Sequence, residues 1–257
     1  MTVLWQKKRG NIHYKVTRAG ASTRLYTNGI FHSQYNSRQP VAGNLWDLLF
    51  LPTLMHPHPN AIERVLVLGV GGGAVIKQLQ HFLSPSQILG VDLDPVHLQI
   101  ARRFFQVTQS NVELIQAEAK AWLAQYTGEP FDVIVEDLFM GRAGPHGQVE
   151  PVRAIPANAA WLDCLAANLK EEGVLVMNFE SGYSLGRSAC KLALSNNTFS
   201  SAYRLFCPRY ENIIAALLRK PLRQDQFVEA LRQFEALDQR RSSCRLQFDW
   251  RKLYARE

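Results

Sequence analysis

The feature that most limits how this chain can fold is a glycine-rich turn between an apolar strand and a helix. Residues 65–74 read VLVLGVGGGA, so an aliphatic run leads directly into Gly69, Gly71, Gly72 and Gly73. Glycine is needed in such a turn because a side chain would keep the backbone away from a nucleotide, and because the turn visits φ angles that a Cβ atom disfavours. The segment predicts a strand, turn and helix that bind a nucleotide.

Beyond this turn, short apolar runs alternate with helical segments, which is typical of a parallel sheet with helices on both faces. The predicted strands are residues 64–68, 87–91, 112–115, 131–135 and 173–178, and the predicted helices are residues 74–82, 95–105, 119–126, 158–169 and 188–196. A terminal strand pair at 202–206 and 213–218 and an amphipathic helix at 224–238 follow. The residues at 140–151, rich in glycine and proline, are predicted to form a loop.

The N-terminal part has a different pattern, in which strand-forming residues surround an Asn28-Gly29 pair. This pair is a strong signal for a β-hairpin turn. An apolar stretch at residues 41–55, long enough for a helix, ends at the sequence HPHPN. We therefore expect a small β-strand region with a linking helix at 1–58, an α/β domain at 59–220, and a basic helical extension at 221–257.

Composition limits the class of protein further. The 257 residues, 47% hydrophobic and 20% charged, suffice for one large core with a small accessory domain. No apolar run approaches the roughly 20 residues that cross a bilayer, and the first ten residues are too polar for a secretory signal. Four widely spaced cysteines, with no Cys-x-x-Cys pair, indicate neither a zinc site nor a disulfide framework. We expect a cytoplasmic protein with no metal and no membrane partner.

The net charge of +7 would favour an anionic partner. The basic residues are scattered, however, and no run of lysine or arginine is interleaved with aromatic side chains, as it is in proteins that bind single-stranded nucleic acid. A solvated basic surface is the favoured interpretation, and nucleic acid is not expected as a partner.

Acidic residues follow three successive predicted strands. Asp92 ends the second strand, Glu118 follows the third, and Asp137 follows the fourth. Because carboxyl ends of parallel strands meet at the edge where ligands bind, these side chains should share one site. A carboxylate at Asp92 can accept hydrogen bonds from both ribose hydroxyls, and Glu118 is placed to reach an adenine edge. With the adjacent Leu93 and Ala119, this series predicts an S-adenosylmethionine pocket.

Other interpretations stay open. Gly69, Gly71 and Ala74 also satisfy the G-x-G-x-x-G/A dinucleotide motif, which an NAD-dependent dehydrogenase would carry. Asp94 is expected to cap the next helix, since aspartate is a good N-cap residue. Glu118 could equally be a solvent-facing loop residue.

On these motifs the sequence resembles the spermidine synthase family over about residues 11–220. The resemblance implies a Rossmann-like class I methyltransferase fold, with a mostly parallel seven-stranded sheet and an antiparallel terminal strand, preceded by a small β-rich domain. It also implies that the glycine turn and Asp92 hold the nucleoside, that Glu118 contacts adenine, and that Asp137 is the base toward the acceptor. A homodimer is expected on the same ground. The motifs that carry the resemblance are Asn28-Gly29-Ile30, the HP at 56–57, the glycine turn, the VDLD at 91–94, the FDVI at 131–134 with Asp137, and the strand at 173–177.

The departures from the family concern its substrates. Gly72 stands where the family has an aspartate that meets the charged tail of decarboxylated S-adenosylmethionine, and the helix before the sheet has Asn44-Leu-Trp in place of a Tyr-His-Glu type segment. The loop whose second aspartate grips a polyamine ammonium reads DLFM from Asp137 to Met140. Because a buried ammonium without a counter-charge costs several kcal/mol, this loss argues against a polyamine.

We therefore predict an S-adenosylmethionine-dependent methyltransferase that acts on an unidentified small acceptor, with Asp137 as the base. Aminopropyl transfer from decarboxylated S-adenosylmethionine and a non-catalytic nucleoside-binding module are the alternatives. The acceptor-side candidates are Gln34, in the segment expected to close over the pocket, Met140, and Asn178 at the end of the fifth strand. Each of these residues has an equally good structural explanation, as has Glu180 beside Asn178.

Overall fold

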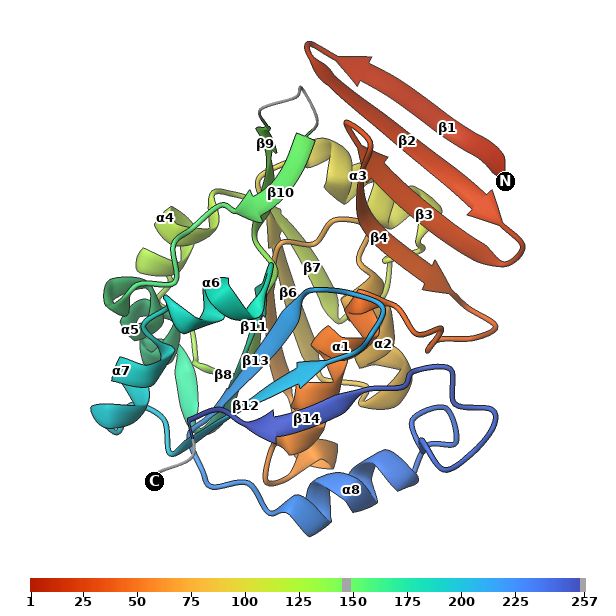
Figure 1. Cartoon of the computed structure of the whole chain (residues 1–257). Coiled ribbons are helices and arrows are strands. Elements are labelled where there is room, and N and C mark those ends of the chain that lie inside the picture. The colour runs from red at the N-terminus through yellow and green to blue at the C-terminus, as the bar shows by residue number, and fades with distance from the viewer. Residues whose placement is uncertain (145–148, 255–257) are drawn as a thin grey trace.

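The computed structural model describes residues 1–144 and 149–254. Within them the chain forms a four-stranded antiparallel sheet, a two-stranded hairpin and an eight-stranded mixed sheet covered by helices (Figure 1). The small sheet consists of β1 (Thr2–Arg9), β2 (Ile12–Ala19), β3 (Ser22–Thr27) and β4 (Ile30–Asn36). The predicted N-terminal β-rich region is thus confirmed, and it gains a first strand, β1, that the sequence analysis did not predict.

The turn between β3 and β4 is the predicted Asn28-Gly29 hairpin turn. Both residues have positive φ angles, 50° and 83°, as the mirror-image turns of tight hairpins require. The Asn28 side chain accepts a hydrogen bond from the backbone nitrogen of His13 at 2.8 Å, which ties the turn to the neighbouring strand.

The helix predicted at residues 41–55 begins later and changes form before it ends. It is α1 (Leu45–Phe50), followed by the 3₁₀ helices η1 (Leu51–Met55) and η2 (Pro59–Ala61). Asn44 and Asp47 form a capping box at its start, and one Asp47 oxygen also accepts from the backbone nitrogens of Ala42 and Gly43. Gly43, with φ of 78°, holds the chain in a turn here, so the helix cannot start at residue 41.

The large sheet has the strand order β14-β12-β13-β11-β8-β5-β6-β7. The sequence predicted the parallel strands β5, β6, β7, β8 and β11. It also predicted an antiparallel terminal strand, which is β13 and runs opposite to β11 and β12. An eighth strand, β14, was not predicted, because its four residues are mostly polar and show no apolar alternation. The strands are β5 (Arg64–Leu68), β6 (Gln87–Asp92), β7 (Val112–Gln116), β8 (Phe131–Glu136), β11 (Leu169–Phe179), β12 (Ser201–Phe206), β13 (Ile213–Leu218) and β14 (Asp249–Lys252).

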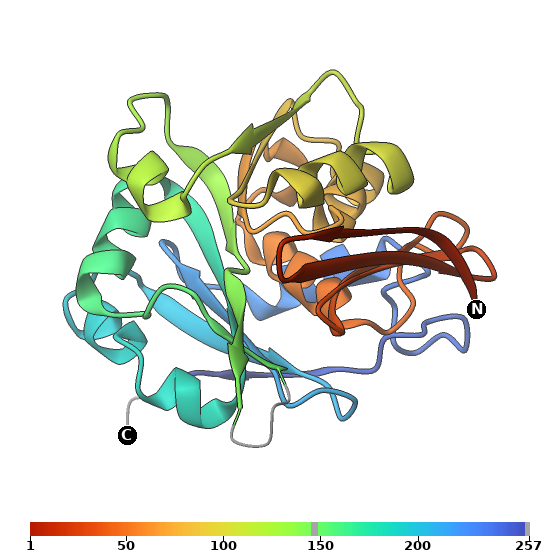
Figure 2. The same cartoon turned by 90° about the horizontal axis from the view of Figure 1, so that it is seen from above.

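Alternating side chains along the strands build two cores, one on each face of the large sheet. On β5, Val65 and Val67 belong to the core under α1, α2 and the small sheet, whereas Leu66 and Leu68 belong to the core under α4, α5 and α7. Figure 2 shows these two groups of helices on opposite sides of the sheet. The helices are α2 (Ala74–Phe82), α3 (Pro95–Phe104), α4 (Ala119–Ala124), α5 (Ala159–Ala167), α6 (Gly182–Gly186), α7 (Cys190–Ser195) and α8 (Gln224–Arg232).

Residues 140–151 were predicted to form a loop, and this prediction is wrong for most of the described part of the segment. The structure has a β-hairpin there, made of β9 (Phe139–Ala143) and β10 (Val149–Arg153). Glycine and proline suggested a loop, but Pro151 pairs with Gly141 in an isolated two-stranded sheet, where a missing N–H disrupts no central ladder. Residues 145–148, within the predicted loop, lie outside the described residues.

The topology places a switch point between β5 and β8. The chain leaves β5 to build β6 and β7 on one side and then returns as β8 on the other side. Ligands of open α/β sheets bind at such a switch point, beyond the carboxyl ends of the strands. Gly69 follows β5 and Asp137 follows β8, so two of the predicted site residues meet there.

The residues after 220, predicted as a basic helical extension, are packed into the large core. Phe227 on α8 is completely buried, and its ring lies 5.2 Å from that of Trp250 on β14. Because β14 pairs with β12, this segment both covers the sheet and extends it.

Replacing Phe227 by alanine is expected to lower the free energy of unfolding by about 3–5 kcal/mol, because the cavity would lie inside the shared core. Urea denaturation followed by circular dichroism measures the change. The matched control is Leu192→Ala on α7, whose side chain is 49% exposed and should cost less than about 1 kcal/mol. Equal, small losses in both variants would show that the segment after residue 220 folds separately from the core.

Candidate functional site

The glycine turn after β5 has the backbone geometry that the sequence predicted. Gly69, Gly71 and Gly73 have φ angles of 88°, 52° and 82°, which side chains disfavour. A Cβ atom on Gly69 would lie 2.2 Å from the backbone oxygen of Asp137. The turn after β5 and the segment after β8 are therefore in direct contact, and only glycine permits it.

Gly72 is enclosed between α3 and the small sheet. A Cβ atom there would lie 2.6 Å from the ring of Phe105 and 2.8 Å from the Cβ of Ser33 on β4. Both of those residues are buried. The small sheet thus lies directly over the glycine turn, and Gly72 cannot be replaced by a larger residue unless its neighbours move.

Asp92, the predicted ribose ligand, holds the glycine turn in place. Its Oδ2 accepts from the backbone nitrogens of Val70 and Gly71 at 3.0 and 2.9 Å, and its Oδ1 accepts from that of Asp94 at 2.9 Å. Burial raises the pKa of Asp92, but the nearby His97 and these backbone donors outweigh burial, so the pKa is lowered overall. Since a carboxylate oxygen can accept two hydrogen bonds, Oδ1 retains capacity for a ribose hydroxyl, and that contact stays a prediction.

Asp94 has the capping role that the sequence predicted. Its Oδ1 accepts from the backbone nitrogen of Val96, which is in the first turn of α3, at 2.8 Å. Its other oxygen accepts from the Tyr14 hydroxyl of β2 at 2.6 Å. His97 lies between the two carboxylates, with Nδ1 3.6 Å from Asp92 and Nε2 4.0 Å from Asp94. The sequence analysis missed Tyr14 and His97, because no local motif marks them.

Glu118, the predicted adenine ligand, caps α4. Its two oxygens accept from the backbone nitrogens of Lys120 and Ala121 at 3.0 and 2.7 Å. The residue is exposed, and the adjacent Ala119 is buried. The structure therefore gives Glu118 a structural role, while its contact with adenine stays a prediction. Leu93 is 68% exposed at the same edge and is free to pack against a planar ring.

Asp137, the predicted base, is held by the fifth parallel strand. Asn178 on β11 donates from Nδ2 to Asp137 Oδ1 at 2.8 Å, and Asn212 donates to Asn178 Oδ1 at 3.1 Å. Burial raises the pKa of Asp137 to about 6, although the Asn178 hydrogen bond opposes this rise. No described residue donates to its other oxygen. A carboxylate with this pKa can both take up and release a proton near neutral pH.

A buried ion pair fixes the β9–β10 hairpin beside the site. Arg153, at the end of β10, places Nη2 2.6 Å from Glu136 on β8, and the Glu136 side chain is completely buried. The backbone nitrogen of Arg153 also donates to Glu180 at 2.7 Å, and its guanidinium donates to the backbone oxygen of Asn178. Glu180, considered for the acceptor side, thus serves to anchor Arg153. The sequence analysis missed Glu136 and Arg153.

The remaining acceptor-side candidates have different surroundings. Gln34 is buried, and both ends of its carboxamide are bonded inside the protein: Arg24 donates to it at 2.6 Å, and it donates to Asn44 at 3.1 Å. The structure therefore shows it joining β3, β4 and the start of α1. Asn178 is equally buried but reaches Asp137, and Met140 on β9 is 54% exposed.

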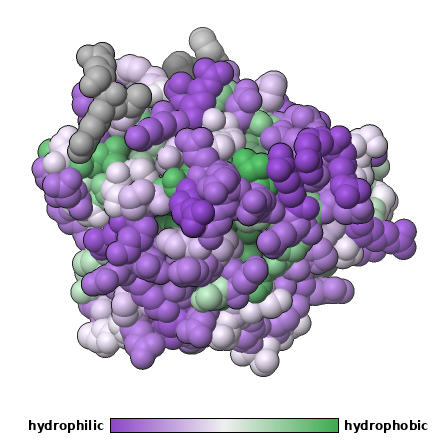
Figure 3. Space-filling model, turned by 90° about the horizontal axis from the view of Figure 1, so that it is seen from below, coloured by the Kyte–Doolittle hydropathy of each residue, from purple (hydrophilic) through white to green (hydrophobic). Residues whose placement is uncertain are grey.

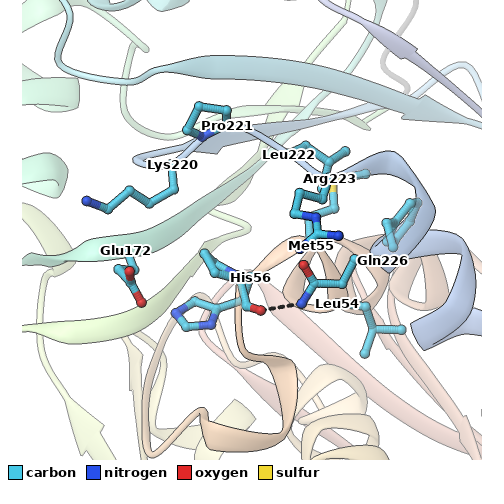
Figure 4. Close-up of a pocket in the computed structure, with 11 residues that line it drawn as sticks. Leu54, Met55, His56, Glu172, Lys220, Pro221, Leu222, Arg223 and Gln226 are labelled. Carbon is cyan, nitrogen blue, oxygen red and sulfur yellow. Dashed lines mark hydrogen bonds between the residues drawn. The ribbon is translucent and has the colours of Figure 1, made fainter.

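A separate hollow, drawn in Figure 4, lies beside the amino-terminal half of β11. It has a volume of about 200 Å³, and its lining includes His56, Glu172 and Lys220. Gln226 donates from Nε2 to the backbone oxygen of Pro57 at its side. Glu172 is near the amino end of β11, whereas ligands of such sheets bind at the carboxyl ends.

The face of the molecule seen from below has a mostly polar surface with small apolar areas (Figure 3).

Within residues 1–144 and 149–254, no helix is long and apolar enough to cross a membrane. In the same described part of the chain, no group of three or more His, Cys, Asp or Glu side chains could hold a metal ion. The four cysteines are free thiols.

Sequence similarity to known proteins is confined to part of the chain. Residues 65–148 match a family model described as a methyltransferase domain. The chain is 29% identical over 106 residues to a polyamine aminopropyltransferase 2 of Caldanaerobacter subterraneus subsp. tengcongensis, covering 38% of this chain and 35% of that protein. It is 30% identical over 101 residues to an eEF1A lysine and N-terminal methyltransferase homolog of Drosophila pseudoobscura pseudoobscura, covering 36% of this chain and 15% of that protein. The alignments therefore span about a third or less of these relatives.

Similarity of fold extends along nearly the whole chain. A solved structure of a probable spermidine synthase from Corynebacterium glutamicum ATCC 13032 superposes with a TM-score of 0.70 at 16% sequence identity, over 90% of this chain and 88% of that one. The chain has a spermidine synthase-like fold. Over about a third of its length it is a distant relative of the polyamine aminopropyltransferases, and residues 65–148 resemble a methyltransferase domain. Its relatives divide between aminopropyltransferases and methyltransferases, so they do not define the acceptor.

In this spermidine synthase-like protein, Arg153→Met is expected to lower the free energy of unfolding by about 3–5 kcal/mol, because Glu136 would stay buried without its partner. The double variant Glu136→Gln with Arg153→Met should recover much of that loss. Urea denaturation of the two single variants and the double variant measures the coupling. Strictly additive losses would contradict a direct interaction between the two charges.

Proposed function

We propose that this protein is a methyltransferase that transfers the methyl group of S-adenosylmethionine to a small acceptor without a cationic amine. The observation that carries the proposal is the packing around Gly72. The resemblance to the spermidine synthases places a carboxylate at this position, where it would meet the ammonium of the aminopropyl tail. Here the Phe105 ring and Ser33 fill the space that the carboxylate would need.

The loss of this carboxylate favours the complete cofactor over its decarboxylated form. A lone ammonium in this part of the site would have no counter-charge, and an unpaired charge is costly to remove from water. The tail of S-adenosylmethionine carries its own carboxylate beside the ammonium, so the two charges partly compensate each other. Methyl transfer uses the complete cofactor, whereas aminopropyl transfer uses the decarboxylated one.

The acceptor side supports the same proposal, because two carboxylates near Asp137 are already engaged. Glu136 pairs with Arg153, and Glu180 binds the backbone of Arg153. The residues after Asp137 are apolar, and three exposed apolar side chains follow β6 or belong to the β9–β10 hairpin: Leu93, Met140 and Val149. An apolar, uncharged acceptor fits these surroundings better than a polyamine, which needs a counter-charge for each ammonium.

The chemistry required of the protein is limited. S-adenosylmethionine supplies a methyl group already activated by a sulfonium. The glycine turn and Asp92 would hold the nucleoside. As the acceptor's attacking atom bonds to the methyl carbon, the methyl–sulfur bond would break, S-adenosylhomocysteine would leave with the electron pair, and Asp137 would accept the proton that the attacking atom loses. Positioning of the two reactants supplies much of the rate in such a displacement. Asn178 would orient Asp137 through its 2.8 Å hydrogen bond.

A second candidate, aminopropyl transfer with altered amine recognition, is supported by the fold similarity over 90% of the chain. The position of Asp137 after β8 suits either reaction. The two candidates differ in which form of the cofactor binds, and a direct binding comparison separates them.

Calorimetric titration should show that S-adenosylmethionine binds at least about tenfold more tightly than its decarboxylated form, because glycine at position 72 leaves the lone ammonium without the counter-charge that a carboxylate there would supply. NAD(H) should not bind. In the control variant Asp92→Ala both adenosyl ligands should bind more weakly, since the glycine turn loses two backbone hydrogen bonds and the ribose loses an acceptor. Tighter binding of the decarboxylated form would replace this proposal by aminopropyl transfer.

The rate of methyl transfer should depend on the ionisation of Asp137, whose pKa is raised to about 6. A base is active when deprotonated, so kcat/KM is expected to fall as the pH drops through about 6. Transfer of label from S-adenosylmethionine tritiated in its methyl group into a pool of small metabolites provides the assay. Asp137→Asn should keep cofactor affinity but lose turnover; full activity in this variant would exclude Asp137 as the base.

A further inference from the structure

A buried polar cluster connects the small N-terminal sheet to the glycine turn. Its centre is His97 on α3, whose Nδ1 lies 3.6 Å from Asp92 Oδ2 and whose Nε2 lies 4.0 Å from Asp94 Oδ2. The side chains of His97 and Asp92 are each 10% exposed, and that of Asp94 is 23% exposed. Among the described residues, His97 is the ion-pair partner of both Asp92 and Asp94.

The small sheet supplies the other side of the cluster. Thr27, at the end of β3, places its hydroxyl 2.8 Å from His97 Nε2, and the Tyr14 hydroxyl of β2 donates to Asp94 at 2.6 Å. The ring of His32 on β4 lies 5.1 Å from that of His97. Three strands of the small sheet therefore contact the residues that shape the glycine turn. None of these three side chains bonds to the turn itself.

We propose that His97 is a positioning residue, through which the N-terminal sheet holds Asp92, and with it the glycine turn, in the arrangement that receives the adenosine. Two successive contacts connect the N-terminal sheet to Asp92. Thr27 fixes the ring of His97, and His97 fixes Asp92, whose Oδ2 accepts from Val70 and Gly71. This inference rests on the proposed function, because it assumes that the glycine turn binds an adenosyl ligand.

The charge of His97 is central to this role. Asp92 and Asp94 are two carboxylates joined by a hydrogen bond from the backbone of one to the side chain of the other, and they repel when both are ionised. Burial lowers the pKa of His97, but the two carboxylates raise it more strongly, so His97 stays protonated to a higher pH than usual. A protonated His97 lies between the two carboxylates and compensates part of their negative charge.

The other titratable groups that face the cluster do not supply this charge. Burial lowers the pKa of His32 to about 4, so this ring is neutral at physiological pH. Burial and Asp94 raise the pKa of Tyr14, so its hydroxyl keeps its proton. The charge of Arg9 on β1 opposes this rise in the pKa of Tyr14, and Arg9 is exposed.

The direction of the pH dependence follows. His97 has a raised pKa in the folded protein, so its stabilising interaction is complete below the ordinary histidine pKa and is lost as the pH rises through the folded value. Adenosine affinity should therefore be high near neutral pH and fall in the alkaline range. A merely structural histidine would not give the ligand affinity this profile.

The test uses calorimetric binding of 5′-deoxy-5′-methylthioadenosine, which carries the adenosine without an ionisable amino-acid tail, between about pH 6 and pH 9. Wild-type affinity is expected to fall with rising pH. His97→Gln should bind about tenfold more weakly at the low end and show no pH dependence. Thr27→Val, which removes only the hydroxyl contact from the sheet, should also weaken binding. The control His32→Gln should keep the wild-type pH profile, since His32 is neutral throughout this range.

Hydrogen exchange of the ligand-free protein gives an independent readout. The amides of Val70 and Gly71 should exchange faster in His97→Gln and in Thr27→Val than in the wild type. Wild-type affinity and exchange rates in both variants would overturn the role of His97 while leaving the adenosyl site intact. Failure of the wild-type protein to bind any adenosyl ligand would instead overturn the proposed function and this inference with it. If His97→Gln does not fold, Thr27→Val alone decides.

Discussion

The geometry of the site depends on one buried carboxylate. Asp92 accepts hydrogen bonds from the turn after β5 and from the start of α3, so a single side chain holds together the two segments that border the predicted nucleoside position. A buried carboxylate is costly unless its oxygens are satisfied, and here three backbone donors and His97 satisfy them. The conformation of the glycine turn is therefore set from outside the turn, by β6 and α3.

Features that depend on near neighbours could be predicted from the sequence. The Asn28-Gly29 turn, the glycine turn and the Asp94 cap each involve residues a few positions apart, and all three are in the structure. The contacts of His97 could not be predicted, because Thr27 lies 70 positions before it, and Tyr14 lies 80 positions before Asp94. The hairpin β9–β10 and strand β14 were missed for a related reason. Their pairing is set by the partner strand, and their own sequences carry weak strand signals.

Polar residues at strand ends show why candidate ligands are harder to predict than the fold. A carboxylate in such a position can face a ligand or satisfy a nearby backbone nitrogen, and the sequence is the same in both cases. Glu118 caps α4, and Glu180 accepts from the backbone of Arg153, whereas Asp137 has only the Asn178 side chain as a described donor. The number of donors around each carboxylate shows how much acceptor capacity it keeps for a ligand, and that number requires the structure.

The packing around Gly72 links the choice of cofactor to the small N-terminal sheet. The fold is shared over 90% of the chain with a protein that is only 16% identical, so the backbone tolerates extensive change in sequence. An aspartate at position 72 is nevertheless not accessible by one substitution, because its Cβ would meet both the Phe105 ring and Ser33. Restoring the carboxylate would require smaller residues both at Phe105, directly after α3, and at Ser33 on β4. Because protein interiors are closely packed, either change made alone would leave a void and lower stability. The contact that encloses the glycine turn is therefore also the contact that leaves position 72 without a carboxylate.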